Sequence, residues 1–568
     1  MPSEPVSDGI EEGLRATPRG PSLLLKKLFL AAALLLPAAA GVALIFLAPY
    51  LAQRFGAGRT WDAPVYFREQ LLFLGRCALF LAFLGPFFLW RRFKGVPLDR
   101  NVLDCALIAG SFLCIDSYCR REFWHDTLAL AVWLRDSSLR ELLLPGAPNP
   151  FCQAAPAGFI VLSKGIGSLF GFSRWALNVP VLLLALGSLW NFRRLAVKVL
   201  PVAGAAAAAA LFALTPGLWL YAGEFKQYTG DLFFTVTLLL FAAEFCASPE
   251  KGWAKLALTG AAGTFFSHAM LFVLPALGLG LLPRLERKTL PAIAGIAAVW
   301  IAAVTCAGLY AMATMPPDMY VHEHHIAGFA PPPDSWEHIT WYGRSFCAFF
   351  SAPWGLNWRI SFLFVIPAAL MVRGAVLLYR KFPAAVLGFA ALMVMLFTAS
   401  ALHLYSVAPG FPFAKGRLIL FTTPFALILF AGGITGLRSL AAGTIVLISC
   451  LLNCVFAFMP IGGFAPAVRA LLRQTSPGAV VHVNGKTAEY ALRLYAPEGY
   501  FRKIVVFDPA APEKVLPRQG KVHIFTVDKD PDSWKLPLPL KLQGPRRTFD
   551  FACVMTAQAA PAPPPGQR

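Results

Sequence analysis

The chain has 568 residues, of which 57% are hydrophobic and 14% are charged. Because charged residues make up about 25% of an average soluble domain, this composition excludes an ordinary soluble protein. The formal net charge of +20 would suit a nucleic-acid-binding protein, but the Lys and Arg residues are spread over many short turns and form no single patch. We therefore expect no nucleic-acid partner.

Long apolar runs predict an all-α polytopic membrane protein. Runs of the length that crosses about 30 Å of hydrocarbon as a helix recur along most of the chain. We expect about 13 transmembrane helices, at 28–50, 70–90, 102–116, 175–192, 199–220, 229–247, 254–267, 268–283, 291–313, 360–379, 384–403, 418–436 and 439–460. The runs at 254–267 and 268–283 could also form one kinked helix around His268, but the basic turn that follows them favours two.

Basic residues set the expected orientation, because they occupy every second turn. The main pairs are Lys26–Lys27, Arg91–Arg92, Arg193–Arg194, Arg284–Arg287 and Arg380–Lys381. The positive-inside rule makes these turns cytoplasmic. We expect a cytoplasmic tail at 1–25, a transmembrane domain at 26–461 and outward loops on the opposite side. The composition suggests a bacterial cell inner membrane.

The first large outward loop, 117–174, carries the leading catalytic candidate. Asp126 follows Trp124 and His125 and precedes an amphipathic run. A carboxylate here could accept a proton or hold a divalent ion, or it could cap a helix over 127–135. Further along, 155–172 has apolar residues at helical spacing and predicts a helix lying in the outer interface, or else the first turn of the next span.

Later outward segments supply more polar candidates. Glu224, Lys226 and Tyr228 stand together after the span that ends at 220. Glu224 could be a catalytic acid, or it could form a purely structural pair with Lys226 or a neighbouring loop residue. Lys415 and Arg417 could bind a phosphate or anchor the helix end at lipid headgroups. The His322–His325 cluster lacks a second group at ligand spacing, so a mobile flap is favoured there over a metal site.

The composition changes after Pro460. Segments 478–485, 503–507, 521–527 and 548–554 predict strands, and 487–495 predicts a helix between the first two. A small extracytoplasmic α/β domain at 462–556 follows from this order. The Ala/Pro-rich end, 557–568, is expected to be disordered.

Three motifs in order resemble membrane glycosyltransferases of the GT-C fold. They are Asp126, then Gln153-Ala-Ala-Pro-Ala-Gly-Phe159 with Leu169-Phe-Gly-Phe-Ser-Arg-Trp-Ala-Leu177, and then Tyr221-Ala-Gly-Glu-Phe-Lys-Gln-Tyr-Thr-Gly-Asp231. The resemblance covers about 100–460 and is nearest to bacterial enzymes that use polyprenyl-phosphate sugars, the protein mannosyltransferases and the lipid A aminoarabinose transferase. Thr127 stands where the family often has a second acid, Ala157 replaces a usual Pro, and two extra spans precede the motifs.

The resemblance implies an activity and roles for these residues. Asp126 would be the base or a metal ligand, Glu224 a second active-site acid, and Lys226, with Lys415 and Arg417, would bind the donor phosphate. We expect His125, Gln153, Tyr228 and Arg344 to contact substrate. The cofactor stays open, with a divalent cation at Asp126 the candidate, and the acceptor could be a lipid, a glycan or a protein.

A transporter or flippase of lipid-linked sugars is the alternative function. Such proteins place their charged groups near the bilayer midplane. Here the candidate side chains stand at the outer rim instead, which favours the transferase. The absence of any GxGxxG or GxxxxGK[ST] pattern fits a donor that carries a lipid phosphate rather than a nucleotide.

Overall fold

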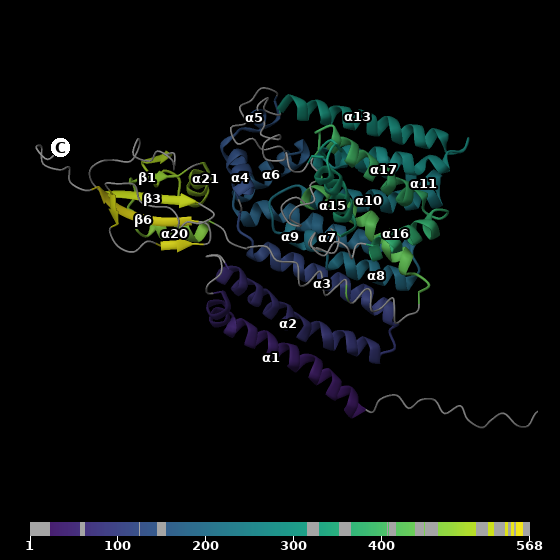
Figure 1. Ribbon diagram of the computed structural model, residues 1–568, viewed down its shortest axis with the longest axis horizontal. Helices are drawn as coiled ribbons and strands as arrows, with labels where there is room; N and C mark the ends of the chain where they lie inside the picture. The colour runs from purple at the N-terminus through teal and green to yellow at the C-terminus, as the bar shows by residue number, and fades with distance from the viewer. Residues whose placement is uncertain are drawn as a thin grey trace, which may run out of the picture. The chain divides into compact units, whose positions relative to one another are not determined.

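In the computed structural model the chain is mainly helical, with a small sheet near its C-terminus (Figure 1). The structure describes residues 23–56, 63–123, 125–144, 155–314, 329–351, 365–405, 407, 416–437, 448, 464–484, 486–506, 521–527, 540–542, 547–549 and 552–559. Within these ranges, seven helices are long and apolar enough to cross a membrane. The expected class, a polytopic α-helical membrane protein with a small α/β domain, is confirmed.

The chain forms two compact units, and the first ends at Asn101. It contains α1 (Leu23–Gly56) and α2 (Ala63–Phe93), which are the two extra spans noted in the sequence. Lys26 Nζ lies 5.6 Å from the centre of the Phe93 ring, so the start of α1 is beside the end of α2. A side chain on Gly41 would come within 2.7 Å of the Gly75 carbonyl, because the two backbones approach closely there.

The second unit holds the remaining helices. Its first half contains α3 (Leu98–Arg120, from residue 102 onward), α4 (His125–Asp136), α5 (Leu139–Leu143), α6 (Ala157–Phe170), α7 (Arg174–Val199), α8 (Val202–Ala213), α9 (Pro216–Tyr221) and α10 (Tyr228–Ala247). Then follow α11 (Pro249–Phe266), α12 (Met270–Leu281) with η1 (Leu282–Arg284), α13 (Leu290–Thr314), α15 (Trp336–Ser351), α16 (Val365–Leu378), α17 (Pro383–Ala401), η5 (Gly416–Thr422) and α18 (Thr423–Ile434). The expected span at 439–460 lies outside the described residues apart from 448, so the count of 13 stays a prediction.

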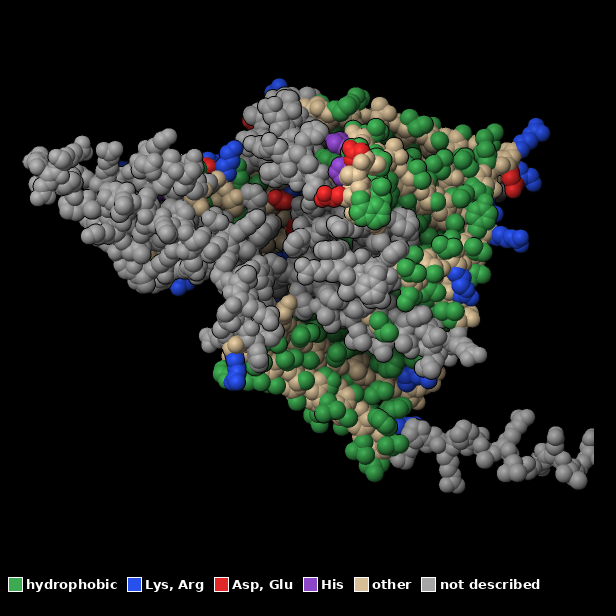
Figure 2. Space-filling model, viewed as in Figure 1, with side chains coloured by type: hydrophobic (Ala, Val, Ile, Leu, Met, Phe, Trp, Pro, Cys, Tyr) green, Lys and Arg blue, Asp and Glu red, His purple; other side chains and the backbone are tan. Residues whose placement is uncertain are grey.

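The basic turns of this unit meet at one end of the helices. Contacts there join Arg193 to Asp104 at 2.7 Å, Arg194 to Glu244 at 3.9 Å, Arg284 Nη2 to the carbonyl of Arg380 at 3.2 Å, and Lys381 Nζ to the carbonyl of Val199 at 3.0 Å. Lys and Arg side chains stand at the right-hand edge in Figure 2, where α11, α13 and α16 have ends in Figure 1. The turns that carry basic residues, which are every second turn in the sequence, therefore lie at the same end of the helices in the structure.

The break between α11 and α12 lies at the opposite end. Ser267, in this break, donates a hydrogen bond of 2.6 Å to Asp231 in the first turn of α10. Lys255 near the start of α11 reaches Glu244 at the basic end, at 4.0 Å, and Arg284 after α12 is there too. The chain thus reverses at Ser267, and two helices form, as the basic turn required.

The C-terminal α/β domain follows α20 (Ala465–Leu472) and has the expected strand, helix and strand at its start. Its elements are β1 (Val480–Val483), α21 (Lys486–Tyr495), β2 (Lys503–Val506), β3 (Lys521–Val527), β4 (Leu540–Leu542), β5 (Arg547–Phe549) and β6 (Ala552–Ala559). The sheet order is β2-β1-β3-β6-β4, parallel from β2 to β3 and antiparallel beyond, with β5 also on β6.

Two details of the domain differ from the sequence prediction. The expected strand at 548–554 is two strands, β5 and β6. The strand β6 continues to Ala559, where Gln558 pairs with Lys521, so 557–559 are sheet and not disordered tail. Only Ala557, Gln558 and Ala559 continue the strand past 556, and these residues resemble the Ala/Pro-rich composition that follows them.

The α/β domain shares its hydrophobic core with two helices of the membrane part. One continuous cluster contains Leu128–Leu134 of α4 and Phe159 of α6 together with Val481, Leu492 and Phe525 of the α/β domain. In α4 each of residues 128–134 is at most 4% exposed, so this central part of the helix is buried on all sides. A helix that is apolar all round must have partners on every face, and α21 supplies one of them.

Candidate active site

The segment after α3 places the first candidate acid. The structure begins α4 at His125, so Asp126 lies in the first turn of the helix rather than ahead of it as a cap. A carboxylate in a first turn is stabilised by the positive end of the helix dipole. Asp126 is partly exposed, in contrast to the buried run that follows it.

Arg174, at the start of α7, holds the segment between α3 and α4 in place. Its guanidinium donates to the carbonyls of Arg121 at 2.9 Å and Cys119 at 3.1 Å, and it lies 3.4 Å from Glu122. These bonds satisfy carbonyls that the end of α3 leaves open. Ser173 also accepts a hydrogen bond from the Ala176 N–H and caps α7. The Ser-Arg-Trp part of the second motif therefore fixes the start of α7 against the end of α3.

The turn from α9 to α10 carries the second candidate acid. Residues 222–226 are buried, and the Lys226 N–H donates to the Glu224 carbonyl at 2.7 Å. Asn178 Nδ2 of α7 donates to the Gly223 carbonyl at 3.0 Å. A side chain on Gly223 would meet the Ser117 carbonyl at 2.5 Å, so only glycine lets this turn lie against α3.

Glu224 forms a buried ion pair with Arg121. Its Oε2 lies 3.3 Å from Arg121 Nη1, and both side chains are less than 10% exposed. The same Nη1 donates to the Leu220 carbonyl at 2.7 Å. The structural alternative named Lys226 or a neighbouring loop residue as the partner of Glu224; the partner recorded here, Arg121, directly follows α3 and lies within the expected outward loop 117–174. Lys226 is buried nearby at 7% exposure.

Phe225 brings the two acidic segments together. Its ring packs on Phe123, with centroids 6.0 Å apart, and on Phe159 of α6, at 5.4 Å. Phe123 stands three positions before Asp126, and Phe225 directly follows Glu224. The residues around the two acids therefore lie side by side, and Phe225 also packs against α6.

The α6 helix is a separate element, which decides between the two predictions for 155–172. It ends at Phe170, Gly171 has φ of 84°, and α7 begins anew at Arg174. Leu169 and Phe170 are exposed at 78% and 74%. The alternative of a first turn of the next span is wrong, and the exposed apolar end fits a helix at a lipid interface.

Tyr405 links the site to the segment that contains Arg417. Its hydroxyl donates to the Leu418 carbonyl at 2.6 Å. Burial, together with the charge of Asp231 and the neighbouring Tyr228, raises the pKa of Tyr405 well above its ordinary value. Tyr228 itself packs edge-on against Tyr221, with ring centroids 5.0 Å apart.

Several expected site residues cannot be placed as side chains. His125, Arg344 and Arg417 belong to α4, α15 and η5, whose backbones alone are described at these positions. Gln153, Lys415 and the His322–His325 cluster lie outside the described residues. In the part of the chain that the structure describes, no three His, Cys, Asp or Glu side chains gather into one group.

Comparison with family models and with curated proteins gave no match. Among solved structures, the chain is similar to ArnT from Cupriavidus metallidurans bound to undecaprenyl phosphate, at 12% identity over 80% of this chain and 97% of that one, with a TM-score of 0.47. It is also similar to the oligosaccharyltransferase AglB from Archaeoglobus fulgidus in complex with an inhibitory peptide and a dolichol-phosphate, at 12% identity, 77% and 70% coverage and a TM-score of 0.44. The mycobacterial arabinofuranosyltransferase AftD gives 14% identity, 81% and 41% coverage and 0.39. At these values the likeness decides neither the fold family nor the activity of this chain.

Proposed function

We propose that the protein is an integral-membrane glycosyltransferase of the GT-C type. It transfers a sugar, with a hexose as the expected class, from a polyprenyl-phosphate donor to an acceptor on the extracytoplasmic side. The N-terminus is cytoplasmic, the α/β domain is extracytoplasmic, and the membrane is a bacterial inner membrane. The resemblance of the three sequence motifs supplies the reaction class.

One observation supports this proposal most strongly. The Asp126 and Glu224 segments, far apart in sequence, come together through Phe123 and Phe225. They do so at the end of α3, α7 and α10 that is opposite the basic turns. With the basic end in the cytoplasm, the acids face the other compartment, at the rim of the bilayer.

The chemistry assigns a role to each residue. The acceptor hydroxyl loses a proton to Asp126 as its oxygen attacks the anomeric carbon, and the bond from that carbon to the phosphate oxygen breaks. The departing lipid phosphate carries the negative charge, which Lys226, Lys415 and Arg417 stabilise. Glu224, paired with Arg121, orders the turn that presents Lys226 and adds a second negative group beside the cationic transition state.

The experiment measures turnover of a polyprenyl-phosphate hexose by the purified full chain in nanodiscs. Asp126→Asn is expected to abolish turnover, and Glu224→Gln to lower it at least tenfold, which corresponds to about 1.4 kcal/mol of barrier. Asp116→Asn is the matched control, because Asp116 pairs with Arg120 near the same end of α3 and has no assigned role. Its rate should stay within twofold of the wild type.

Two results would contradict the proposal. Donor turnover that survives Asp126→Asn in a folded protein would remove the base from the mechanism. Movement of the intact donor across the bilayer, without hydrolysis or transfer, would identify a flippase.

A further inference from the structure

A cavity of about 480 Å³ lies where α4 ends against the α/β domain, and the proposed transfer reaction does not use it. Its walls come from the last two residues of α4, the end of α21 and the turn that follows. The residues that decide its chemistry are Arg135, Asp136, Arg493, Glu498, Tyr500 and Phe501. All of them belong to the second unit of the chain.

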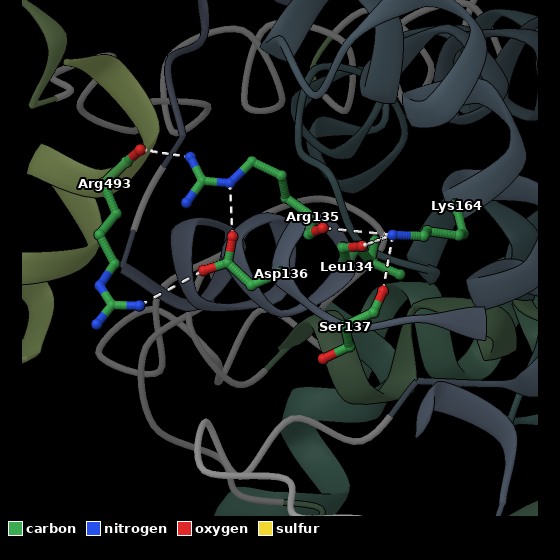
Figure 3. A network of polar contacts seen from close by, with 6 residues as sticks. All are labelled: Leu134, Arg135, Asp136, Ser137, Lys164 and Arg493. Carbon is green, nitrogen blue, oxygen red and sulfur yellow. Dashed lines mark hydrogen bonds and ion pairs between the residues drawn. The ribbon is translucent and has the colours of Figure 1, made fainter. Parts of the chain in front are cut away.

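The charged side chains of the cavity are balanced. Asp136 lies between two guanidinium groups, 2.7 Å from Arg135 Nε and 3.5 Å from Arg493 Nη1 (Figure 3). Glu498 is an exposed carboxylate that also lines the cavity. Arg493 is also paired with Glu489, at 2.7 Å, so the two cations face at least as many carboxylates and present no excess positive charge to an anion. Together these groups offer both hydrogen-bond donors and acceptors.

The aromatic side of the cavity is also fixed. Tyr500 donates to the carbonyls of Thr475 at 2.7 Å and Leu472 at 3.0 Å, which anchors its ring. Phe501 packs against it edge-on, with centroids 5.0 Å apart. Gly499, with φ of 69°, has no atom within 4 Å of the position a side chain would take, so this part of the wall is open.

We propose that this cavity binds a neutral saccharide, as part of an acceptor that is itself a glycan or glycolipid. Hydroxyl groups both donate and accept, so they match paired carboxylates and guanidinium groups, and the apolar face of a sugar ring packs on an aromatic ring. The acceptor role, but not the binding itself, rests on the proposed glycosyltransferase function.

The distance along α4 defines which part of the acceptor is held. Asp126 and Asp136 are at opposite ends of this helix, so at 1.5 Å per residue they are about 15 Å apart along its axis. The bound saccharide is therefore a distal segment and not the group that receives the new sugar.

Lys164 keeps this spacing constant. Its ammonium group, from α6, donates to the carbonyls of Leu134 and Ser137, both at 2.7 Å, and of Arg135 at 3.3 Å (Figure 3). A cation on the final carbonyls of a helix satisfies open acceptors and complements the negative end of the dipole. Arg135 and Asp136 in the wall of the cavity and Asp126, the candidate base, thus belong to one helix.

Saturation-transfer NMR on the full-length protein in nanodiscs tests the site directly. The probes are maltotriose and mannotriose, with a hyaluronan tetrasaccharide as the acidic comparison. We expect transfer to the neutral probes, weakened at least tenfold in affinity by Glu498→Gln and by Arg493→Gln. Arg502→Gln is the matched control, because this exposed arginine follows Phe501 but is outside the cavity.

The outcomes separate this inference from the proposed function. Asp126→Asn should leave saccharide binding unchanged while it abolishes donor turnover. Saccharide binding by a wild type that never turns over donor would overturn the transferase and leave the site standing. No binding of the neutral probes, preference for the acidic probe, or binding that both cavity variants leave unchanged would overturn the site.

Discussion

The carboxylate of Glu224 is less than 10% exposed and has the Arg121 guanidinium 3.3 Å away. A pair of this kind is costly to break, because loss of one partner leaves the other charge buried and uncompensated. The pair also ties the end of α3 to the turn before α10. The first effect of this ion pair is thus on the placement of the two segments that carry the candidate acids.

Arg121→Gln is therefore expected to lower stability by about 3–5 kcal/mol. Adding Glu224→Gln to the same chain should restore part of that loss, because the uncompensated carboxylate is then removed. The measurement is the thermal unfolding midpoint of the two single variants and the double variant in one detergent. Strictly additive effects would show that the two side chains do not interact.

Tyr405 gives a prediction that depends on pH. Its folded-state pKa is raised, mainly by burial. The stability that its neutral hydroxyl contributes is therefore complete below the unfolded pKa of about 10 and is lost as pH rises toward the folded value. Tyr405→Phe should be destabilised by about 0.5–1.5 kcal/mol at pH 7, through loss of the bond to the Leu418 carbonyl.

The unfolding midpoints of wild type and Tyr405→Phe from pH 7 to 11 test this. The difference between them should narrow above about pH 10, since only the wild type has a phenol to ionise. A difference that stays constant to pH 11 would mean that Tyr405 ionises equally in both states.

Arg121 shows what sequence reasoning missed at this scale. A contact between residues far apart in the sequence has no local pattern, so the sequence could name only Lys226 or an unspecified loop residue as a structural partner of Glu224. A signal did exist: Arg120 and Arg121 stand at the outer end of a span, where the positive-inside rule expects few basic residues. The position of Arg121 at the outer end of the span is explained by its ion pair with the buried Glu224.

At the scale of elements, α3 and the turn at Gly223 lie in close contact in the candidate site. Gly223→Ala would place a methyl group 2.5 Å from the Ser117 carbonyl, a backbone atom that cannot turn aside. Overpacking of this kind costs about 1–3 kcal/mol. Because the turn carries Glu224, donor turnover should fall as well.

Gly278→Ala in α12 is the matched control, since no atom lies within 4 Å of the added methyl group. Alanine favours a helix interior by about 1 kcal/mol over glycine, so this variant should be neutral or slightly stabilised. The unfolding midpoints and donor turnover of both variants test whether α3 and the Gly223 turn are in close contact. Equal midpoints would show that α3 and the Gly223 turn are not in close contact.

Helices were predictable where hydropathy alone decides them. The spans around α3, α7, α10, α13 and α17 were found because a crossing helix needs a long apolar run. The reversal at Ser267 was found from charge, since the basic residues after α12 must return to the same side. The sequence predicts one strand where the structure has β5 and β6, because Asp550 is the only turn-favouring residue between Phe549 and Ala552.

At the scale of the molecule, α4 belongs to the membrane part by sequence and to the α/β domain by packing. Residues 128–134 share one apolar core with Leu492 and Phe525. Arg135 also donates to the carbonyl of Arg493. The composition change after Pro460 marks a boundary in sequence, whereas the core continues across it, and no sequence pattern records such a contact.

This shared core predicts that α4 and the α/β domain unfold together. Leu492→Ala, at a side chain 1% exposed in α21, should destabilise the domain by about 2–5 kcal/mol. If the core is one cooperative unit, amide protection in residues 128–134 should fall by the same free energy, although the substitution is in another part of the chain. Hydrogen–deuterium exchange of the α4 peptides measures this.

Leu84→Ala in α2 is the control, because it removes a leucine of similar burial, 8% exposed, from the other compact unit. It should reduce protection in α1 and α2 and leave α4 unchanged. If Leu492→Ala opened the α/β domain and α4 kept its protection, Asp126 would be held by the membrane part alone. The α/β domain would then have no part in positioning Asp126, whereas a joint loss of protection would make the α/β domain part of the structure that positions Asp126.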